Sequence, residues 1–205
     1  MVENVKNEMQ TNRVRTRRAL KRKAIIDATA AQLAESGLSA TTLDRVGERV
    51  GLSKAALYYY VDSRDELLAL LLDRLLAGIR AEAGERTADS SSPLDQLRSL
   101  LRSHIEQAVL LPEGQLIVSN VDALAAAPAT AASLHAHELA ARALVEAAIA
   151  AGELREVDSL VATTVLFGAS NTMCRTYDPD GTRPLAEMID ATLDLTLGAW
   201  VPTPR

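Results

Sequence analysis

A glycine turn between two short capped segments restricts the fold of this chain more than any other feature of its sequence. Val46 and Val50 lie on one side of the first segment, and Gly51 ends it with the residue that best tolerates a left-handed backbone. Ser53 can then cap a second segment, which runs from Lys54 to about Tyr60. Two short helices joined by such a turn are predicted, which is the pattern of a helix-turn-helix.

Helix signals also precede this motif. An earlier helix is expected from Ala24, where apolar residues begin to recur at helical spacing, to Gly37. Thr41 and Asp44 have the spacing of a capping box, so they are expected to open the helix before the turn.

The rest of the chain has helical spacing as well. Ser63 and Glu66 form a second capping pair, which starts a long helix ending near Gly84, and a serine-rich linker follows over residues 87–93. Further helices are expected at about residues 94–111, 128–152, 157–174 and 184–200, with a short apolar stretch through Val121 after the first of them. Hydrophobic residues make up 48% of the chain and aromatic residues 3%, so aliphatic packing between helices must supply most of the core.

These patterns predict an all-α fold, with an N-terminal three-helix unit that contains the helix-turn-helix and a larger helical C-terminal domain. The expected divisions are a basic flexible arm at residues 1–19, a helix-turn-helix domain at 20–66 and a helical regulatory and dimerisation domain at 67–205.

Charge is divided unevenly along the chain. Residues 1–64 hold 12 Lys and Arg against 7 Asp and Glu, a charge of +5, whereas residues 65–205 hold 10 against 20, a charge of −10. A run without any acidic residue contains Arg13, Arg15, Arg17, Arg18, Lys21, Arg22 and Lys23. Such a run is attracted to a polyanion, although a solvated solubilising tail is the alternative. Followed by a helix-turn-helix, it favours double-stranded DNA as the partner.

Roles for single residues follow from this motif, in which the second helix enters the major groove. Lys54 is the expected base contact, and Ala55 beside it also faces DNA. Phosphate contacts, which fix position but carry no sequence information, are expected from Thr42, Tyr58, Tyr59 and Arg64. Packing within the small unit is the alternative for the tyrosines, and it is the interpretation preferred for Tyr60.

The same region resembles the TetR family of bacterial transcriptional regulators over residues 20–70. The resemblance is carried by Thr41-Thr42-Leu43, Gly51-Leu52-Ser53, Leu57-Tyr58 and Asp62-Ser63-Arg64-Asp65-Glu66-Leu67-Leu68. Ala55 and Ala56 stand where the family usually has Gly and Thr, and Tyr60, Val61 and Arg64 replace the usual His, Phe and Lys. Because the two alanines leave only methyl groups on the reading face, the operator sequence is not transferable from a relative.

The resemblance implies a homodimer that binds a palindromic operator and is released from it, as a repressor, by a small molecule. Its last two helices would form the dimer interface, with packing inside a monomer as the alternative. The expected interface residues are Gly168, Ala169, Ile189, Leu193, Leu197 and Trp200.

Ligand control is expected from polar residues on otherwise apolar helices. The candidates for binding a small, largely apolar effector are His104, Asn120, Phe167, Ser170, Asn171 and Cys174. Hydrogen bonds to the backbone are the alternative for each polar group. A metal site is not expected, because His135 and His137 are two residues apart and point to different helix faces.

Other classes of protein fit less well. Cys174 is the single cysteine, so no intrachain disulfide or Cys-x-x-Cys site can form, and a reducing cytoplasm is expected. There is no apolar run of membrane-spanning length, no uninterrupted signal-peptide core, no glycine-rich phosphate loop and no partnered nucleophile, so neither an enzyme nor a cofactor is expected. An architectural or cell-division DNA-binding protein of the same fold, without an inducer, is the alternative function.

Overall fold

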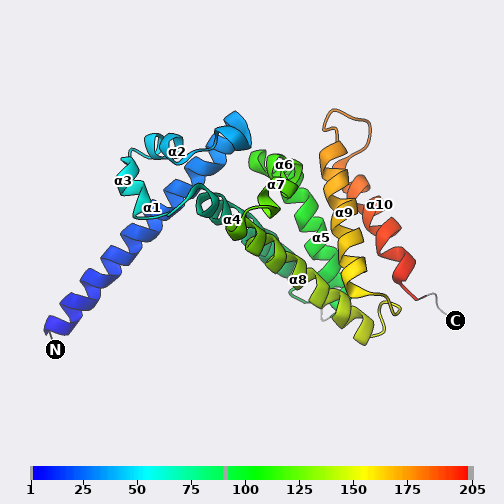
Figure 1. Ribbon diagram of the computed structural model, residues 1–205. Helices are drawn as coiled ribbons and strands as arrows, with labels where there is room; N and C mark the ends of the chain where they lie inside the picture. The colour runs from blue at the N-terminus through cyan, green and yellow to red at the C-terminus, as the bar shows by residue number, and fades with distance from the viewer. Residues whose placement is uncertain (1, 90–91, 203–205) are drawn as a thin grey trace. The chain divides into compact units, whose positions relative to one another are not determined.

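The computed structural model describes residues 2–89 and 92–202, with side-chain detail from residue 15 onward, and these residues contain helices and no strand. In chain order the helices are α1 (Val2–Ala40), α2 (Leu43–Arg49), α3 (Lys54–Tyr58), α4 (Arg64–Arg86), α5 (Pro93–Leu110), α6 (Pro112–Ser119), α7 (Val121–Ala125), α8 (Pro128–Ala150), α9 (Ser159–Thr176) and α10 (Leu185–Thr196), followed by the 3-10 turn η1 (Gly198–Trp200) (Figure 1). The predicted all-α class is confirmed. The chain divides into two compact units, Met1–Leu71 and Leu72–Arg205.

Helix α1 is much longer than expected. The segment predicted to be a flexible arm is helical from Val2 onward, and the helix is interrupted only at Gly37, whose φ is 77°. The physical reason is local: the first 36 residues contain neither Gly nor Pro and are rich in Lys, Arg and Ala, which favour helix. Arg13 lies outside the described side chains.

The helix-turn-helix forms around the predicted turn, with one correction to its caps. Thr42, not Thr41, caps α2, and its hydroxyl accepts a hydrogen bond from the Arg45 amide at 3.4 Å. Thr41 is buried, and its hydroxyl donates back to the Gly37 carbonyl at 2.9 Å. Gly51 has a φ of 64°, and Ser53 caps α3 as predicted.

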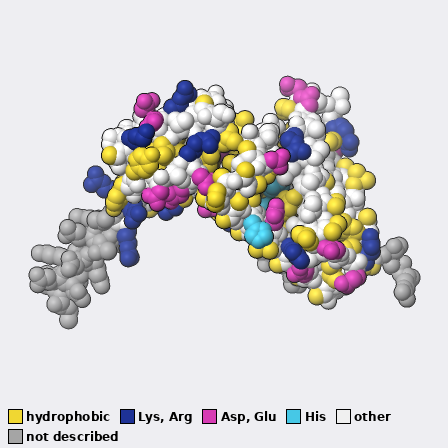
Figure 2. All heavy atoms as spheres, viewed as in Figure 1, with side chains coloured by type: hydrophobic (Ala, Val, Ile, Leu, Met, Phe, Trp, Pro, Cys, Tyr) yellow, Lys and Arg dark blue, Asp and Glu magenta, His cyan; other side chains and the backbone are white. Residues whose placement is uncertain are grey.

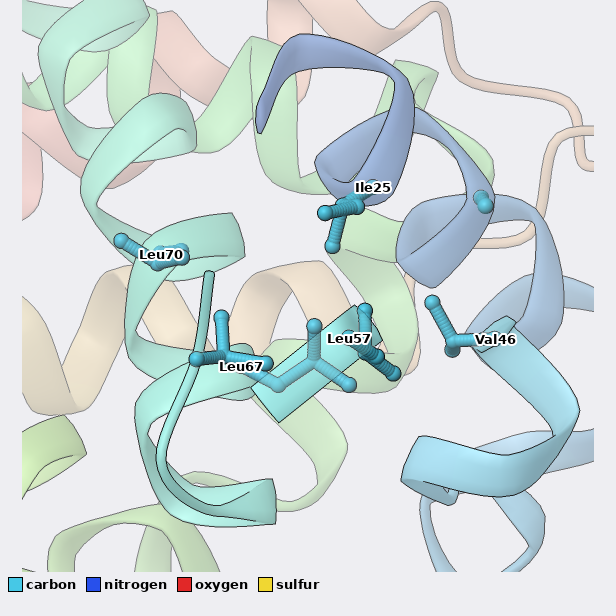
Figure 3. Close-up of a cluster of buried hydrophobic side chains, with 7 residues drawn as sticks. Ile25, Val46, Leu57, Leu67 and Leu70 are labelled. Carbon is cyan, nitrogen blue, oxygen red and sulfur yellow. The ribbon is translucent and has the colours of Figure 1, made fainter. Parts of the chain in front are cut away.

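The N-terminal unit encloses its own apolar core. Figure 3 shows Ile25 of α1, Val46 of α2, Leu57 of α3 and Leu67 and Leu70 of α4 grouped together. Leu57 is only 1% exposed. This cluster holds α3 against the other helices and so fixes which of its faces points outward.

The C-terminal unit is built around α5, which packs against α6, α8 and α9 (Figure 1). Where the sequence indicated only a short apolar stretch, the structure has α6 and α7. Helix α6 approaches α5 so closely that a Cβ at Gly114 would lie 2.4 Å from the Gln107 carbonyl oxygen, so only glycine fits there.

Three residues expected at a dimer interface are buried within the protomer. Ile189, Leu193 and Leu197 belong to its own core, because α10 packs onto α9 and α5. Ion pairs from Arg98 to Asp194 and from Arg102 to Asp190 join α5 to α10. These three apolar residues are therefore unavailable to a partner. No helix in the described part of the chain has the length and apolar character needed to cross a membrane.

Candidate functional site

The outer face of α3 exposes two aromatic side chains. Tyr58 is 44% exposed and Tyr59 is 67% exposed, and Lys54 and Ala55 at the start of the helix are exposed too. On the face of this unit seen in Figure 2, hydrophobic side chains (yellow) lie next to Lys and Arg (dark blue). The short helix that the sequence assigned to DNA thus has a free, mixed aromatic and cationic surface.

Basic residues of α1 lie beside this surface. The Arg18 guanidinium stands 5.4 Å from the centre of the Tyr59 ring, and Tyr59 meets Tyr60 edge to face at 5.2 Å. Arg15, Arg17 and Arg22 are exposed on the same helix, whereas Lys23 is paired with Asp27. Tyr59 is therefore held in place by a cation and an aromatic edge.

Lys54, the expected base contact, is engaged by an acid in this structure. Its ammonium lies 3.1 Å from a carboxylate oxygen of Asp44 on α2. The hydrogen bond to Asp44, with the attraction between the two charges, raises the pKa of Lys54. An anion that binds Lys54 must therefore compete with Asp44.

Two of the basic residues assigned to DNA are used within the unit itself. The Arg64 guanidinium donates to the carbonyls of Thr41 at 2.7 Å and Leu38 at 2.5 Å, and Lys21 donates to the Val50 carbonyl at 3.2 Å. Arg64 thus binds carbonyls at and just past the end of α1, and Lys21 binds the carbonyl at the end of α2. Their geometry favours a structural role over the phosphate contacts that were expected.

Arg64→Ala is therefore expected to lower the free energy of unfolding by about 1 kcal/mol, because two backbone carbonyls lose their charged donor. Chemical denaturation followed by far-UV circular dichroism measures this, with the exposed Arg22→Ala variant as the control for loss of one positive charge. Unchanged stability of Arg64→Ala would contradict the structural role.

A second candidate site lies inside the C-terminal unit, where three rings meet. His104 of α5 and His137 of α8 stack with ring centres 5.5 Å apart, and Phe167 of α9 lies 5.2 Å from His104 and 5.1 Å from His137. His104 Nε2 donates to Asn171 Oδ1 at 2.9 Å. These residues lie far apart in sequence, and the fold brings them together.

Both imidazoles are buried, His104 at 8% exposed and His137 at 3%. Burial lowers the pKa of His104 against the opposing effect of its bond to Asn171. Burial, with the charges of His104 and Arg80, lowers the pKa of His137 to about 3. Both rings are therefore neutral near pH 7.

The rings line a cavity. This inner cavity, of about 50 Å³, has mainly apolar walls from α4 to α9, and its polar lining residues are His104, His137, Glu138 and Asn171. An adjoining outer cavity of about 370 Å³ shares Phe167 and Asn171 and includes His135 and Arg142. In Figure 2, some of the histidine atoms (cyan) are seen recessed in a hollow of this unit.

The predicted ligand residues divide into two groups. His104, Phe167 and Asn171 line the inner cavity, whereas Asn120, Ser170 and Cys174 do not. The remaining three have local roles or are buried elsewhere.

Asn120 donates its side-chain amide to the Leu116 carbonyl at 2.8 Å, at the end of α6. Ser170 and Cys174 are buried, and burial raises the pKa of the Cys174 thiol to about 12. A thiol with that pKa is not an activated nucleophile.

Sequence reasoning missed His137 as a pocket residue. His137 continues the buried stripe of α8 formed by Ala141, Val145 and Ala148, whereas His135 is exposed on the other side. That helical spacing was the signal that could have found it.

A helix-turn-helix unit with an exposed second helix, joined to a larger helical unit with an internal cavity, defines a class of two-part DNA-binding proteins. Residues 25–71 match the model for bacterial regulatory proteins of the tetR family, and residues 90–199 match the tetracyclin repressor-like C-terminal domain. The chain belongs to the tetR family.

Curated relatives match only part of this chain. The HTH-type transcriptional regulator BetI of Burkholderia thailandensis is 32% identical over 90 residues, which cover 43% of this chain and 46% of that protein. BetI of Rhizobium meliloti is 26% identical over 94 residues, 46% of each chain. The chain thus spans about half the length of the curated relatives it matches.

Solved structures match over most of the chain. PfmR, a TetR family transcriptional regulator from Thermus thermophilus, is 28% identical, has a TM-score of 0.60, and the match covers 85% of this chain and 97% of PfmR. AibR, solved in complex with isovaleryl coenzyme A and operator DNA, is 20% identical with a TM-score of 0.67, and the match covers 86% and 98%. The likeness to AibR shows a shared fold.

Proposed function

We propose that this protein is a dimeric, sequence-specific DNA-binding transcription regulator, and that it is a repressor released from a palindromic operator by a small, largely apolar ligand. The observation that carries DNA binding is the exposed face of α3, where Tyr58 and Tyr59 stand beside Lys54 and the exposed arginines of α1. Aromatic hydroxyls and cations are suited to phosphates, and Ala55 near the start of α3 is exposed and can meet base edges.

Dimerisation is supported by apolar side chains left exposed on the last two long helices. Leu160, Val161 and Val165 are exposed on α9, and Leu195 of α10 is 81% exposed. Gly168 is also exposed on α9, where it would let a partner helix approach closely. A two-fold dimer through this face would match the symmetry of a palindromic site.

Ligand control is supported by the cavities of the C-terminal unit. The inner cavity combines apolar walls with a few convergent polar groups, which is the usual composition of a small-molecule site. AibR, of the same fold, has been solved with both an acyl coenzyme A and operator DNA, so this fold can hold both kinds of partner. The ligand would act only through different affinities for the DNA-bound and free states.

The experiment that tests this function is a fluorescence anisotropy titration of the full chain against the DNA flanking its gene. Scrambled DNA of equal length is the control, and two salt concentrations separate phosphate attraction from base contacts. We expect selective, salt-sensitive binding with two subunits per site. Equal, weak binding to both DNAs would refute the operator-specific function and favour an architectural DNA-binding protein.

The ion pair between Lys54 and Asp44 predicts a substitution that raises DNA affinity, whereas most substitutions in a DNA-binding surface lower it. Asp44→Asn is expected to raise DNA affinity several-fold, because Lys54 is released for the DNA and one repelling carboxylate is removed. The same anisotropy assay measures the change, and Asp73→Asn, an exposed acid of the C-terminal unit, controls for net charge. Weaker binding of Asp44→Asn would mean that the pair positions Lys54 for DNA.

A further inference from the structure

We propose that the inner cavity selects an uncharged apolar molecule bearing a hydroxyl group, such as a phenol or an alcohol, and binds that hydroxyl between His104 and His137. This inference rests on the proposed ligand control and names the chemistry of the ligand. It is argued from three buried ring nitrogens that have no hydrogen-bond partner among the described residues: Nδ1 of His104 and both Nδ1 and Nε2 of His137.

His104 presents an acceptor to the cavity. Its Nε2 carries the proton that it donates to Asn171 Oδ1, so in the neutral ring Nδ1 has only a lone pair. That lone pair is buried and can accept a hydrogen bond from a ligand. Asn171 thus determines which tautomer His104 adopts.

His137 presents one donor and one acceptor. In the neutral ring one nitrogen carries a proton and the other a lone pair, and neither has a partner among the described residues. A hydroxyl group is complementary to the two rings together, because it can donate to a lone pair and accept from the N–H of His137. Leaving buried polar groups unpaired is unfavourable, and such a ligand would pair two of them.

The remaining walls of the cavity suit an apolar body. Leu72, Leu75 and Ile79 of α4 line it from one side, and Phe167 lines it from α9. The inner cavity of about 50 Å³ admits the hydroxyl end of a ligand, and the body of a ring or short chain would extend past Phe167 into the adjoining outer cavity of about 370 Å³. Apolar surface of the ligand would be buried there while its hydroxyl meets the imidazoles.

A charged group fits this environment poorly. A carboxylate has no proton to donate, so it could accept from the single N–H of His137 but would face the lone pair of His104 Nδ1. Protonation of the rings would remove that conflict, and burial opposes protonation of both. Arg80 also opposes protonation of His137 by its positive charge. An ammonium group would have to leave water for a mainly apolar cavity, where Glu138 is the acidic residue of the lining and is itself exposed to solvent.

The test is isothermal titration calorimetry on the full-length protein without DNA, with three probes of matched shape: 4-ethylphenol, ethylbenzene and 4-ethylbenzoate. We expect 4-ethylphenol to bind at least tenfold more tightly than either of the others. Repeating the titration in two buffers of different ionisation enthalpy reports proton uptake, and none is expected for 4-ethylphenol.

Variants assign the preference to the histidine pair. His137→Phe is expected to abolish the advantage of 4-ethylphenol over ethylbenzene. Glu187→Ala, at an exposed position of α10 that lines neither cavity, is expected to retain it. Imidazole nitrogen NMR of the wild-type protein provides a second measurement that needs no variant, since 4-ethylphenol should shift the resonances of His104 and His137 more than those of His135, which lines the outer cavity.

Three results would overturn the inference. They are equal affinity for 4-ethylphenol and ethylbenzene, tighter binding of 4-ethylbenzoate with proton uptake, and no binding of 4-ethylphenol. Because the measurement uses no DNA, a protein that fails to bind an operator can still pass it, so failure of the proposed function and failure of this inference are distinguishable.

Discussion

Leu57→Ala is expected to lower the free energy of unfolding of the N-terminal unit by about 2 to 5 kcal/mol. Leu57 is the buried residue of α3 and packs with Ile25, Val46 and Leu67 (Figure 3). Its truncation leaves a cavity beneath the short helix that carries the proposed DNA surface. Operator binding should therefore weaken as well, although Leu57 is buried and unavailable to DNA.

Hydrogen exchange measured by mass spectrometry reports this change for each unit separately, which suits a chain whose two units need not unfold together. Amides of α1 to α3 should exchange faster, while those of α8 and α9 keep their wild-type rates. Tyr58→Ala is the matched control, because it removes a larger but exposed side chain from the next position. Equal exchange in the two variants would show that Leu57 does not hold α3 in place.

Acidification from pH 7 to pH 5 is expected to destabilise the C-terminal unit by about 2 kcal/mol through His137 alone. In the unfolded chain this imidazole has its ordinary pKa near 6.5, whereas burial lowers the pKa in the folded protein to about 3. The unfolded state therefore binds a proton over this interval and the folded state does not. The stability is fully present above about pH 6.5 and is lost progressively as the pH falls toward 3. The pKa of His104 is lowered too, so His104 adds a loss of the same sign.

Denaturant unfolding of the wild-type protein and of His137→Phe at both pH values isolates this effect, because the carboxylates that titrate in the same range are common to both proteins. The wild-type protein should lose about 2 kcal/mol relative to the variant between pH 7 and pH 5. A difference between the two proteins that does not change with pH would mean that His137 is hydrated or protonated in the folded state.

Local sequence signals predicted much of the fold because they act within a few residues. Ser53 caps α3, and Ser63 accepts from the Glu66 amide at 3.0 Å at the start of α4. Gly51 adopts a left-handed backbone, as its place in the turn required. The predicted N-cap of α2 was wrong because either of two adjacent threonines, Thr41 and Thr42, can cap a helix. The length of α1 was missed because a run of basic residues is typical of a flexible arm, although Lys and Arg also favour helix.

The candidate pocket was predicted only in part. Helical spacing correctly grouped Phe167 with Asn171 on one face of α9. It could not show that the side chains of Ser170 and Cys174 are buried in the packed core and do not line the cavity. His137 was considered only as a metal ligand together with its neighbour His135. Its place beside His104 depends on the packing of α8 against α5, which no local pattern reports.

The sequence alone specified the all-α class, most of the helices, the Gly51 turn and Ser53 cap of the helix-turn-helix, the basic character of the N-terminal segment and the family resemblance, because propensity, capping and charge are short-range properties. Tertiary packing settled which partner each side chain meets. It assigned Arg64 and Lys21 to backbone carbonyls, Lys54 to Asp44 and the apolar stripe of α10 to the protomer's own core. The physical reason is that the sequence pattern shows only that an apolar or charged face needs a partner. The three-dimensional arrangement of the helices determines which partner lies within reach.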